Sequence, residues 1–126
     1  MRERGYGRVI NIASLSSYVA FFEVAAYSVS KAAVMALTKS LAIEWGKDGV
    51  CVNASAPGVF PTDLNRSLLE ETARGKELLA RTPLARFGKA AELCGACVFL
   101  ASEAASFVVG ETIAVDGGFL ASGVNC

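Results

Sequence analysis

The chain has 126 residues, of which 53% are hydrophobic and 19% are charged, a composition that suits one globular domain with a substantial core and argues against disorder. Its 12 basic and 12 acidic residues cancel, and no face or tail is visibly basic, so neither nucleic acid nor a membrane is expected as a partner. There is no histidine, which excludes Ser-His and Cys-His catalysis and removes the commonest metal ligand.

The most apolar region, Tyr18 to Met35, is interrupted by Glu23 and Lys31 and is shorter than a clean membrane span. The first four residues, beginning at Met1, lead into no signal-peptide core. We therefore expect a cytoplasmic protein.

The first half of the chain predicts a strand, a loop and a long helix. Arg8 to Ala13 is short, β-branched and apolar at nearly every position, which is typical of a strand buried on both faces of a parallel sheet. Residues 15–24 lack a clean period and are expected to form a loop. From Ala25 to Trp45, alanine, leucine and lysine dominate with apolar residues at helical spacing, so we expect a helix that ends at Gly46.

The predicted long helix carries Tyr27 and Lys31, which are four residues apart and therefore share one face. A positive charge within a few ångströms of a phenol favours the phenolate, so such a pair can work as a proton donor or acceptor. A tyrosine and a lysine on the wet side of a helix have the same spacing, and the surrounding sequence has to decide between the two.

The second half begins with a predicted strand and continues into a charged segment. Val50 to Ala56 reads as a buried strand that is closed by Pro57-Gly58, because a proline cannot extend the ladder. Residues 59–89 carry charges of both signs among leucines, and we expect one or two short exposed helices that act as a lid.

After the lid, Ala90 to Ala101 predicts a helix with an apolar face formed by Leu93, Cys97 and Leu100. Glu111 to Val115 predicts a third strand, ended by the turn Asp116-Gly-Gly. The apolar terminal segment 119–126 is expected to pack against the domain.

Four cysteines stand at positions 51, 94, 97 and 126. Cys94 and Cys97 have the spacing of half a zinc site or of a redox pair, but no second such pair completes four ligands. Free buried thiols are the expected state, and no metal site is predicted.

The predicted order of strand, helix, strand, lid, helix and strand is typical of an α/β fold with a parallel sheet. Ligands of such sheets bind beyond the carboxyl ends of the strands. Ser14 and Pro57-Gly58 follow two strands at those ends, and Tyr27 opens the helix after the first strand. Three separated features therefore converge on one predicted cleft.

From Gly7 to about Leu120 the chain resembles the carboxyl-terminal half of a short-chain dehydrogenase/reductase. The resemblance rests on five motifs in the family's order, namely Asn11-Ile-Ala-Ser14, Tyr27-Ser-Val-Ser-Lys31, Val52-Asn53 before Pro57-Gly58, Thr62, and Val115-Asp-Gly-Gly118. It implies that residues 1–126 form a single partial domain, half of a Rossmann-like doubly wound parallel sheet.

Carried over to this sequence, the resemblance implies that Tyr27 exchanges a proton with the substrate oxygen while a nicotinamide transfers hydride. Ser14 would hold that oxygen by a hydrogen bond, and Lys31 would bind the nicotinamide ribose. The turn after Pro57-Gly58 would hold the carboxamide through the backbone of Val59 and Phe60 and the hydroxyl of Thr62. Asn53 and the Asp116 turn are expected to be structural.

The family binds the dinucleotide pyrophosphate on a glycine-rich TGxxxGxG turn after its first strand. No such stretch is present here, and Gly5 and Gly7 precede a strand instead of following one. NAD or NADP is the implied cofactor, and the choice between them is not encoded in this segment. We expect a truncated or partial reading frame whose sheet has an unpaired, apolar edge at residues 8–13.

Within the family, residues 57–65, 81–88 and 112–120 are most similar to gluconate 5-dehydrogenase and 2-dehydro-3-deoxy-gluconate dehydrogenase members. A small alcohol or ketone of sugar-acid type is the implied substrate, and Arg66, Arg74 or Arg81 on the lid could supply a cation for its carboxylate. The alternative substrate is a 3-oxoacyl-[acyl carrier protein].

The resemblance also implies a homodimer or homotetramer for the complete protein, with interfaces formed by residues 32–41 and 91–120. An alternative from another class is that the isolated chain is an inactive, self-associating module.

Overall fold

The computed structural model describes residues 1–70 and 72–125 and shows one parallel sheet with helices on both faces. The strands are β1 (Gly7–Ile12), β2 (Val50–Pro57) and β3 (Thr112–Val115). The α-helices are α1 (Ala25–Trp45), α2 (Arg66–Leu69), α3 (Ala73–Ala80) and α4 (Cys94–Ala101). Short 3-10 helices are formed by Arg2–Arg4, Leu15–Ser17, Gly46–Asp48, Ala90–Leu93 and Glu103–Ala105.

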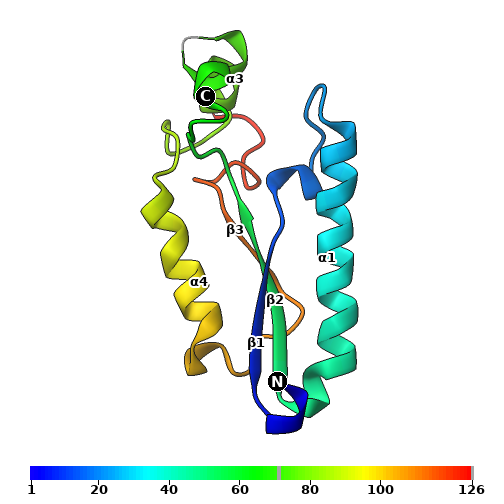
Figure 1. Cartoon of the computed structure of the whole chain (residues 1–126). Helices are drawn as coiled ribbons and strands as arrows, with labels where there is room; N and C mark the ends of the chain where they lie inside the picture. Colours follow the sequence, from blue (N-terminus) through cyan, green and yellow to red (C-terminus); the bar gives the residue numbers. More distant parts are fainter. Residues whose placement is uncertain (71, 126) are drawn as a thin grey trace.

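The strands lie in the order β1-β2-β3, and both pairings are parallel. Gly7 lies opposite Val50, and Ala54 lies opposite Thr112, so β3 pairs with the second half of β2. Helices α1 and α4 lie on opposite sides of this sheet, and the lid helix α3 lies beyond its carboxyl edge (Figure 1). The structure confirms the predicted α/β class and the doubly wound arrangement.

The core is built around β2, which is buried from Val50 through Ala56. On one part of α1, Ala42 packs with Val50 and Val52. Further along, small residues let the helix approach the sheet closely, and Val34 and Met35 contact Ala54 and Ala56. Val50 and Val52 are at most 1% exposed, and burial of each contributes about 1.5–3 kcal/mol to stability. The packing of α1 on β2 therefore fixes the helix relative to the sheet.

Strand β1 is less buried than expected. It is half-buried over most of its length, and Ile12 is 49% exposed, so the expectation of burial on both faces is wrong. The reason is its edge position, since within residues 1–70 and 72–125 it pairs with β2 alone. The same observation confirms the expected unpaired edge, which carries apolar side chains.

The ends of the helices show which glycine stops α1. The helix has the predicted bounds, but Gly46 keeps helical angles and starts a 3-10 turn instead of ending the helix. The reversal occurs at Gly49, whose φ of 75° is left-handed and whose ideal Cβ would lie 2.1 Å from the Gly5 carbonyl oxygen. The predicted helix at 90–101 likewise begins as a 3-10 helix before α4 starts at Cys94.

The three cysteines that the structure describes are free thiols, but they are not all buried. Cys51 is buried, Cys97 is half-buried and Cys94 is exposed, so the expectation of a buried thiol is wrong at Cys94. Cys126 and the lid residue Glu71 lie outside the described residues. In the described part of the chain, no group of three potential ligands could hold a metal ion, and no helix is both long and apolar enough to cross a membrane.

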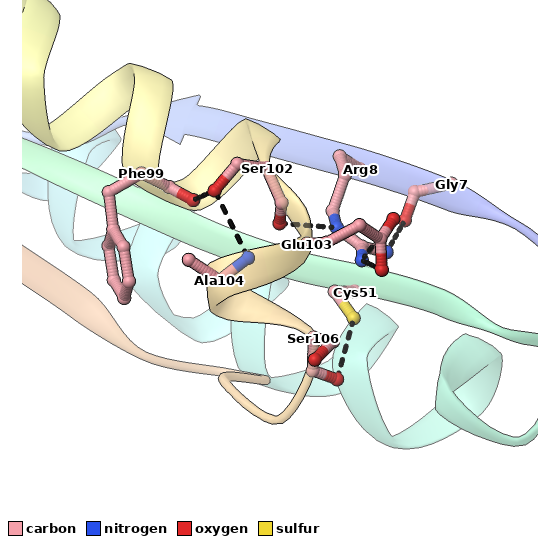
Figure 2. Close-up of polar contacts among 8 residues, drawn as sticks. All are labelled: Gly7, Arg8, Cys51, Phe99, Ser102, Glu103, Ala104 and Ser106. Atoms are coloured by element: carbon pink, nitrogen blue, oxygen red, sulfur yellow. Dashed lines mark hydrogen bonds and ion pairs between the residues drawn. The ribbon is translucent and has the colours of Figure 1, made fainter.

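A group of polar contacts joins the amino end of the sheet to the segment after α4 (Figure 2). The side chain of Arg8 is 9% exposed and donates to the carbonyl oxygens of Gly7 at 3.1 Å and Ser102 at 3.5 Å. Arg8 also forms an ion pair with the exposed carboxylate of Glu103, at 3.5 Å. From β2, the Cys51 thiol donates to the Ser106 carbonyl oxygen at 3.7 Å.

Asn53 anchors the loop between α4 and β3 to the sheet. Its Nδ2 donates to the Val108 carbonyl oxygen at 2.7 Å, and its Oδ1 accepts from the Glu111 N–H at 2.9 Å. The carboxylate of Asp116 similarly accepts two backbone N–H groups of the turn that follows β3. Both residues have the structural roles expected of them.

In the described part of the segment after β3, the buried residue is Phe119, near its start. The ring centroid of Phe119 lies 5.8 Å from that of Phe21 in the loop before α1. The residues from 121 to 125 are largely exposed, although the Asn125 Nδ2 donates to the Ala80 carbonyl oxygen at 2.6 Å. The expected packing therefore holds for Phe119 but not for most of the tail.

Candidate active site

A cleft of about 400 Å³ opens at the carboxyl edge of the sheet. Its walls come from the loop after β1, the start of α1, the turn after β2, and the lid. The predicted site residues among its lining are Ser14, Tyr27, Pro57, Gly58, Val59 and Phe60. The structure therefore brings together three segments that are far apart in the sequence.

Ser14 is the N-cap of the 3-10 helix Leu15–Ser17, which follows β1. Its Oγ accepts hydrogen bonds from the N–H of Ser16 at 3.3 Å and from the hydroxyl of Ser16 at 3.0 Å. A serine hydroxyl has two acceptor positions and one O–H donor. Among the described residues, the Ser14 O–H has no acceptor of its own, and Ser14 lines the cleft.

Tyr27 and Lys31 lie on successive turns at the start of α1. The Lys31 Nζ is 5.8 Å from the centroid of the Tyr27 ring and donates to the Ile12 carbonyl oxygen at 2.8 Å. The lysine is thus held between the end of β1 and the tyrosine, while Tyr27 alone of the two lines the cleft. The ammonium group of Lys31 therefore lies over the Tyr27 ring.

The turn after β2 approaches the turn after β3 very closely. The Gly58 N–H donates to the Val115 carbonyl oxygen at 2.9 Å. An ideal Cβ at Gly58 would lie 2.6 Å from the Asp116 Cα, so only glycine fits there without a shift of the backbone. Among the described residues, no backbone carbonyl accepts from the N–H of Val59 or Phe60, two residues that line the cleft.

Thr62 is exposed and does not line the cleft, although the turn was expected to present its hydroxyl. Its N–H donates to the Asn65 Oδ1 at 2.7 Å, and the Asn65 Nδ2 donates to the Phe60 carbonyl oxygen at 3.0 Å. Asn65 therefore shapes the turn and lines the cleft itself. Sequence reasoning missed it, and the available signal was an asparagine three residues after a threonine, which is typical of a side-chain-capped turn.

The three lid arginines lie in different places. Arg74, on α3, lines the cleft. Arg66 forms exposed ion pairs with Asp63 and Glu70 on its own segment. Arg81 stacks over the Phe119 ring, 4.8 Å from its centroid. Only one of the three candidates for binding an acid is therefore part of the cleft wall.

An ion pair joins the end of the lid to the 3-10 helix Ala90–Leu93. Arg86 donates to both carboxylate oxygens of Glu92 at 2.6 and 2.8 Å, and the Glu92 Oε2 also accepts from the Lys89 N–H at 2.7 Å. These hydrogen bonds, the one from Arg86 foremost, lower the pKa of Glu92 from 4.5 to about 2. Next to this pair, the Gly88 N–H donates to the Val59 carbonyl oxygen at 2.9 Å and so supports the cleft wall.

The Glu92 carboxylate should make stability depend on pH in the acid range. Since its pKa is lower in the folded state, its contribution is present above the unfolded value of 4.5 and is lost as pH falls toward about 2. In urea titrations, Glu92→Gln should lower the midpoint by a constant amount at neutral pH, and the difference from the unsubstituted chain should shrink below about pH 4.5. A difference that stays constant down to the lowest pH would contradict this role.

Comparison with known proteins identifies a matching family and several similar proteins. The family described as Enoyl-(Acyl carrier protein) reductase matches residues 1–120. The chain is 46% identical over 120 residues to 2-dehydro-3-deoxy-D-gluconate 5-dehydrogenase of Bacillus subtilis (strain 168), covering 95% of this chain and 47% of the relative. It is 42% identical over 125 residues to the tropinone reductase homolog At2g29340 of Arabidopsis thaliana, covering 99% of this chain and 41% of the relative.

Among solved structures, the chain is similar to a gluconate 5-dehydrogenase from Burkholderia cenocepacia J2315, crystallised in complex with NADP and tartrate. The TM-score is 0.93 at 44% identity, and the match covers 97% of this chain and 48% of that one. The chain thus spans about half the length of the relatives that it matches. With the family match over residues 1–120 and the shared fold, the chain belongs to the short-chain dehydrogenase/reductase family.

Proposed function

We propose that this chain supplies the catalytic half of an NAD(P)-dependent oxidoreductase that interconverts a secondary alcohol and a ketone on a sugar acid of gluconate type. The observation that carries the proposal is the cleft in which Ser14, Tyr27 and the turn after β2 meet, with Lys31 held beside Tyr27. Relatives named for dehydrogenation of gluconate or its 2-dehydro-3-deoxy derivative support the substrate class.

In the proposed reduction, Tyr27 donates its phenolic proton to the substrate oxygen as the ketone becomes an alcohol. The Ser14 hydroxyl, whose O–H has no acceptor among the described residues, donates a hydrogen bond to the same oxygen and holds it beside the phenol. Lys31 stabilises the phenolate that remains, from a position fixed by its hydrogen bond to the Ile12 carbonyl. Oxidation of the alcohol uses the same groups in the reverse direction.

A bound nicotinamide cofactor supplies or accepts the hydride in this chemistry. The residues present fit one side of that group. Lys31 has donors left beyond the one given to Ile12, which suits ribose hydroxyls, and the N–H groups of Val59 and Phe60 are available for a carboxamide oxygen. Pro57 and Gly58 set the path of that turn. We propose that the Thr62 hydroxyl also binds the carboxamide.

We further propose that residues 1–126 are the carboxyl-terminal half of one domain and that the complete protein is a homodimer or homotetramer. Two exposed apolar surfaces support self-association. One is on α1 and includes Leu37, and the other includes Val98 on α4 and Phe107 in the following loop. Both lie within the segments expected to form subunit interfaces.

A hybrid enzyme tests the proposed activity. This chain, joined behind the amino-terminal half of the Bacillus relative, should reduce 5-keto-D-gluconate in preference to an acetoacetyl thioester. The same chain joined behind the amino-terminal half of the Arabidopsis relative is the control. It shows which half of the hybrid determines the substrate preference. A preference of both hybrids for the thioester would replace the sugar-acid proposal by the 3-oxoacyl alternative.

The isolated chain separates catalysis from association. Fluorescence titration with NADH and NADPH, combined with light scattering, asks whether it binds cofactor and whether it self-associates. Micromolar binding with turnover of any ketone would reject the inactive module. A stable oligomer that binds neither cofactor would show that these residues need the other half of the domain to act.

A further inference from the structure

We propose that Arg74 binds the carboxylate of the substrate and selects acids over neutral ketoses. This inference rests on the proposed function, because it assigns the residue that recognises the acid group of the same substrate. It concerns the end of the substrate that lies away from Tyr27.

Arg74 is the charged member of an otherwise neutral wall. Within residues 1–70 and 72–125, every other side chain that lines the cleft is apolar or an uncharged polar group. Charge interactions are stronger beside apolar walls than in open water. One guanidinium in such a cleft therefore favours a ligand that carries a negative charge.

The guanidinium is held in place by the opposite wall. Its Nη2 donates to the Phe22 carbonyl oxygen at 2.8 Å, across from α3 to the loop before α1. An arginine side chain has five N–H donors in a planar fork, and a carboxylate accepts two of them in parallel. With one donor fixing its orientation, Arg74 keeps a face of the fork for a bidentate ligand.

The position of Arg74 also sets the direction of the substrate. A second cleft of about 440 Å³ adjoins the first, and the two share Phe21, Arg74 and Leu78. The other charged residues that line the second cleft are Glu23, Glu77 and Arg81. Ser14 and Tyr27 line only the first cleft. A substrate whose ketone lies beside those two residues therefore extends its acid group toward the junction, where Arg74 stands.

The other two lid arginines are placed less well for this role. Arg66 lines neither cleft and pairs with carboxylates of its own segment. Arg81 lines only the second cleft and covers the Phe119 ring. Both are natural control positions, because they carry the same charge on the same lid.

Binding to the isotope-labelled 126-residue chain tests the site without any need for turnover. By NMR, D-gluconate should shift the side-chain signal of Arg74, whereas the neutral polyol D-glucitol should not. Arg74→Gln should weaken gluconate binding about 10-fold to 100-fold, the range expected for a charge-assisted hydrogen-bonded pair, while Arg66→Gln leaves it unchanged. Equal binding of the two ligands, or no shift at Arg74, would overturn the proposal.

The KM and kcat of the hybrid enzyme distinguish recognition of the carboxylate from a purely structural role of Arg74. Arg74→Gln should raise KM for 5-keto-D-gluconate about 10-fold to 100-fold with kcat nearly unchanged, since the carboxylate is bound equally in the ground and transition states. KM for L-sorbose, the neutral ketose of the same skeleton, should stay the same, and Arg74→Lys should recover part of the loss.

The two proposals fail in different ways. A gluconate shift at Arg74 without turnover by the hybrid would reject the oxidoreductase and leave the acid-binding site. Turnover with a KM that Arg74→Gln does not change would reject the acid-binding site and leave the oxidoreductase. An equal rise in KM for L-sorbose would show that Arg74 maintains the structure of the lid and does not recognise the charge of the substrate.

Discussion

Replacing Tyr27 by phenylalanine in the hybrid enzyme should lower kcat by about 10²-fold to 10⁴-fold, the usual contribution of a positioned general acid. The substitution removes only the hydroxyl, and the ring keeps its place at the start of α1 beside Lys31. Affinity for the nicotinamide cofactor, measured by fluorescence, should change little.

Tyr18→Phe is the matched control for this substitution. Tyr18 is 44% exposed against 49% for Tyr27, but it does not line the cleft. It should leave kcat unchanged. If the Tyr27 variant retained full activity, another group would have to donate the proton, and the assignment of the acid would be wrong.

Replacing Asn53 by alanine should lower the free energy of unfolding by about 2–4 kcal/mol. Asn53 is 1% exposed and uses its amide to bind the Val108 carbonyl and the Glu111 N–H. Truncation leaves both backbone groups without partners beneath the loop that leads into β3. Urea unfolding followed by circular dichroism measures the loss.

Ser55→Ala is the control on the same strand. Ser55 is also 1% exposed and lies two residues further along β2, but its hydroxyl has no hydrogen-bond partner among the described residues. Its removal should change the free energy of unfolding by less than about 1 kcal/mol, in either direction. Equal losses at the two positions would mean that Asn53 acts through packing and not through its hydrogen bonds.

The parts of the fold that are set by local pattern were predictable from the sequence. Helix α1 has the expected bounds because its alanine-rich composition favours helix over its whole length. The strand before Pro57 was also clear, since a proline interrupts the ladder just where the site begins. Those two elements place Tyr27 and Gly58 at one edge of the sheet.

The features set by long-range contacts were less predictable. The stop of α1 depends on the close approach of Gly49 to Gly5, which no local pattern reports. The exposure of Cys94 depends on which face of α4 meets β1, and an apolar helix with little periodicity does not reveal that face. The choice of Arg74 over Arg66 required the path of the lid.

Transfer of a deuterium label shows whether hydride reaches a sugar acid and whether Tyr27 is needed for that step. The hybrid enzyme is given 5-keto-D-gluconate and a nicotinamide cofactor that carries deuterium at the hydride-donating carbon. The expected product is gluconate with deuterium at C5, and the Tyr27→Phe variant should not form it. A cofactor oxidised without label in any sugar acid, or a label found only in the alcohol formed from an acetoacetyl thioester, would contradict it.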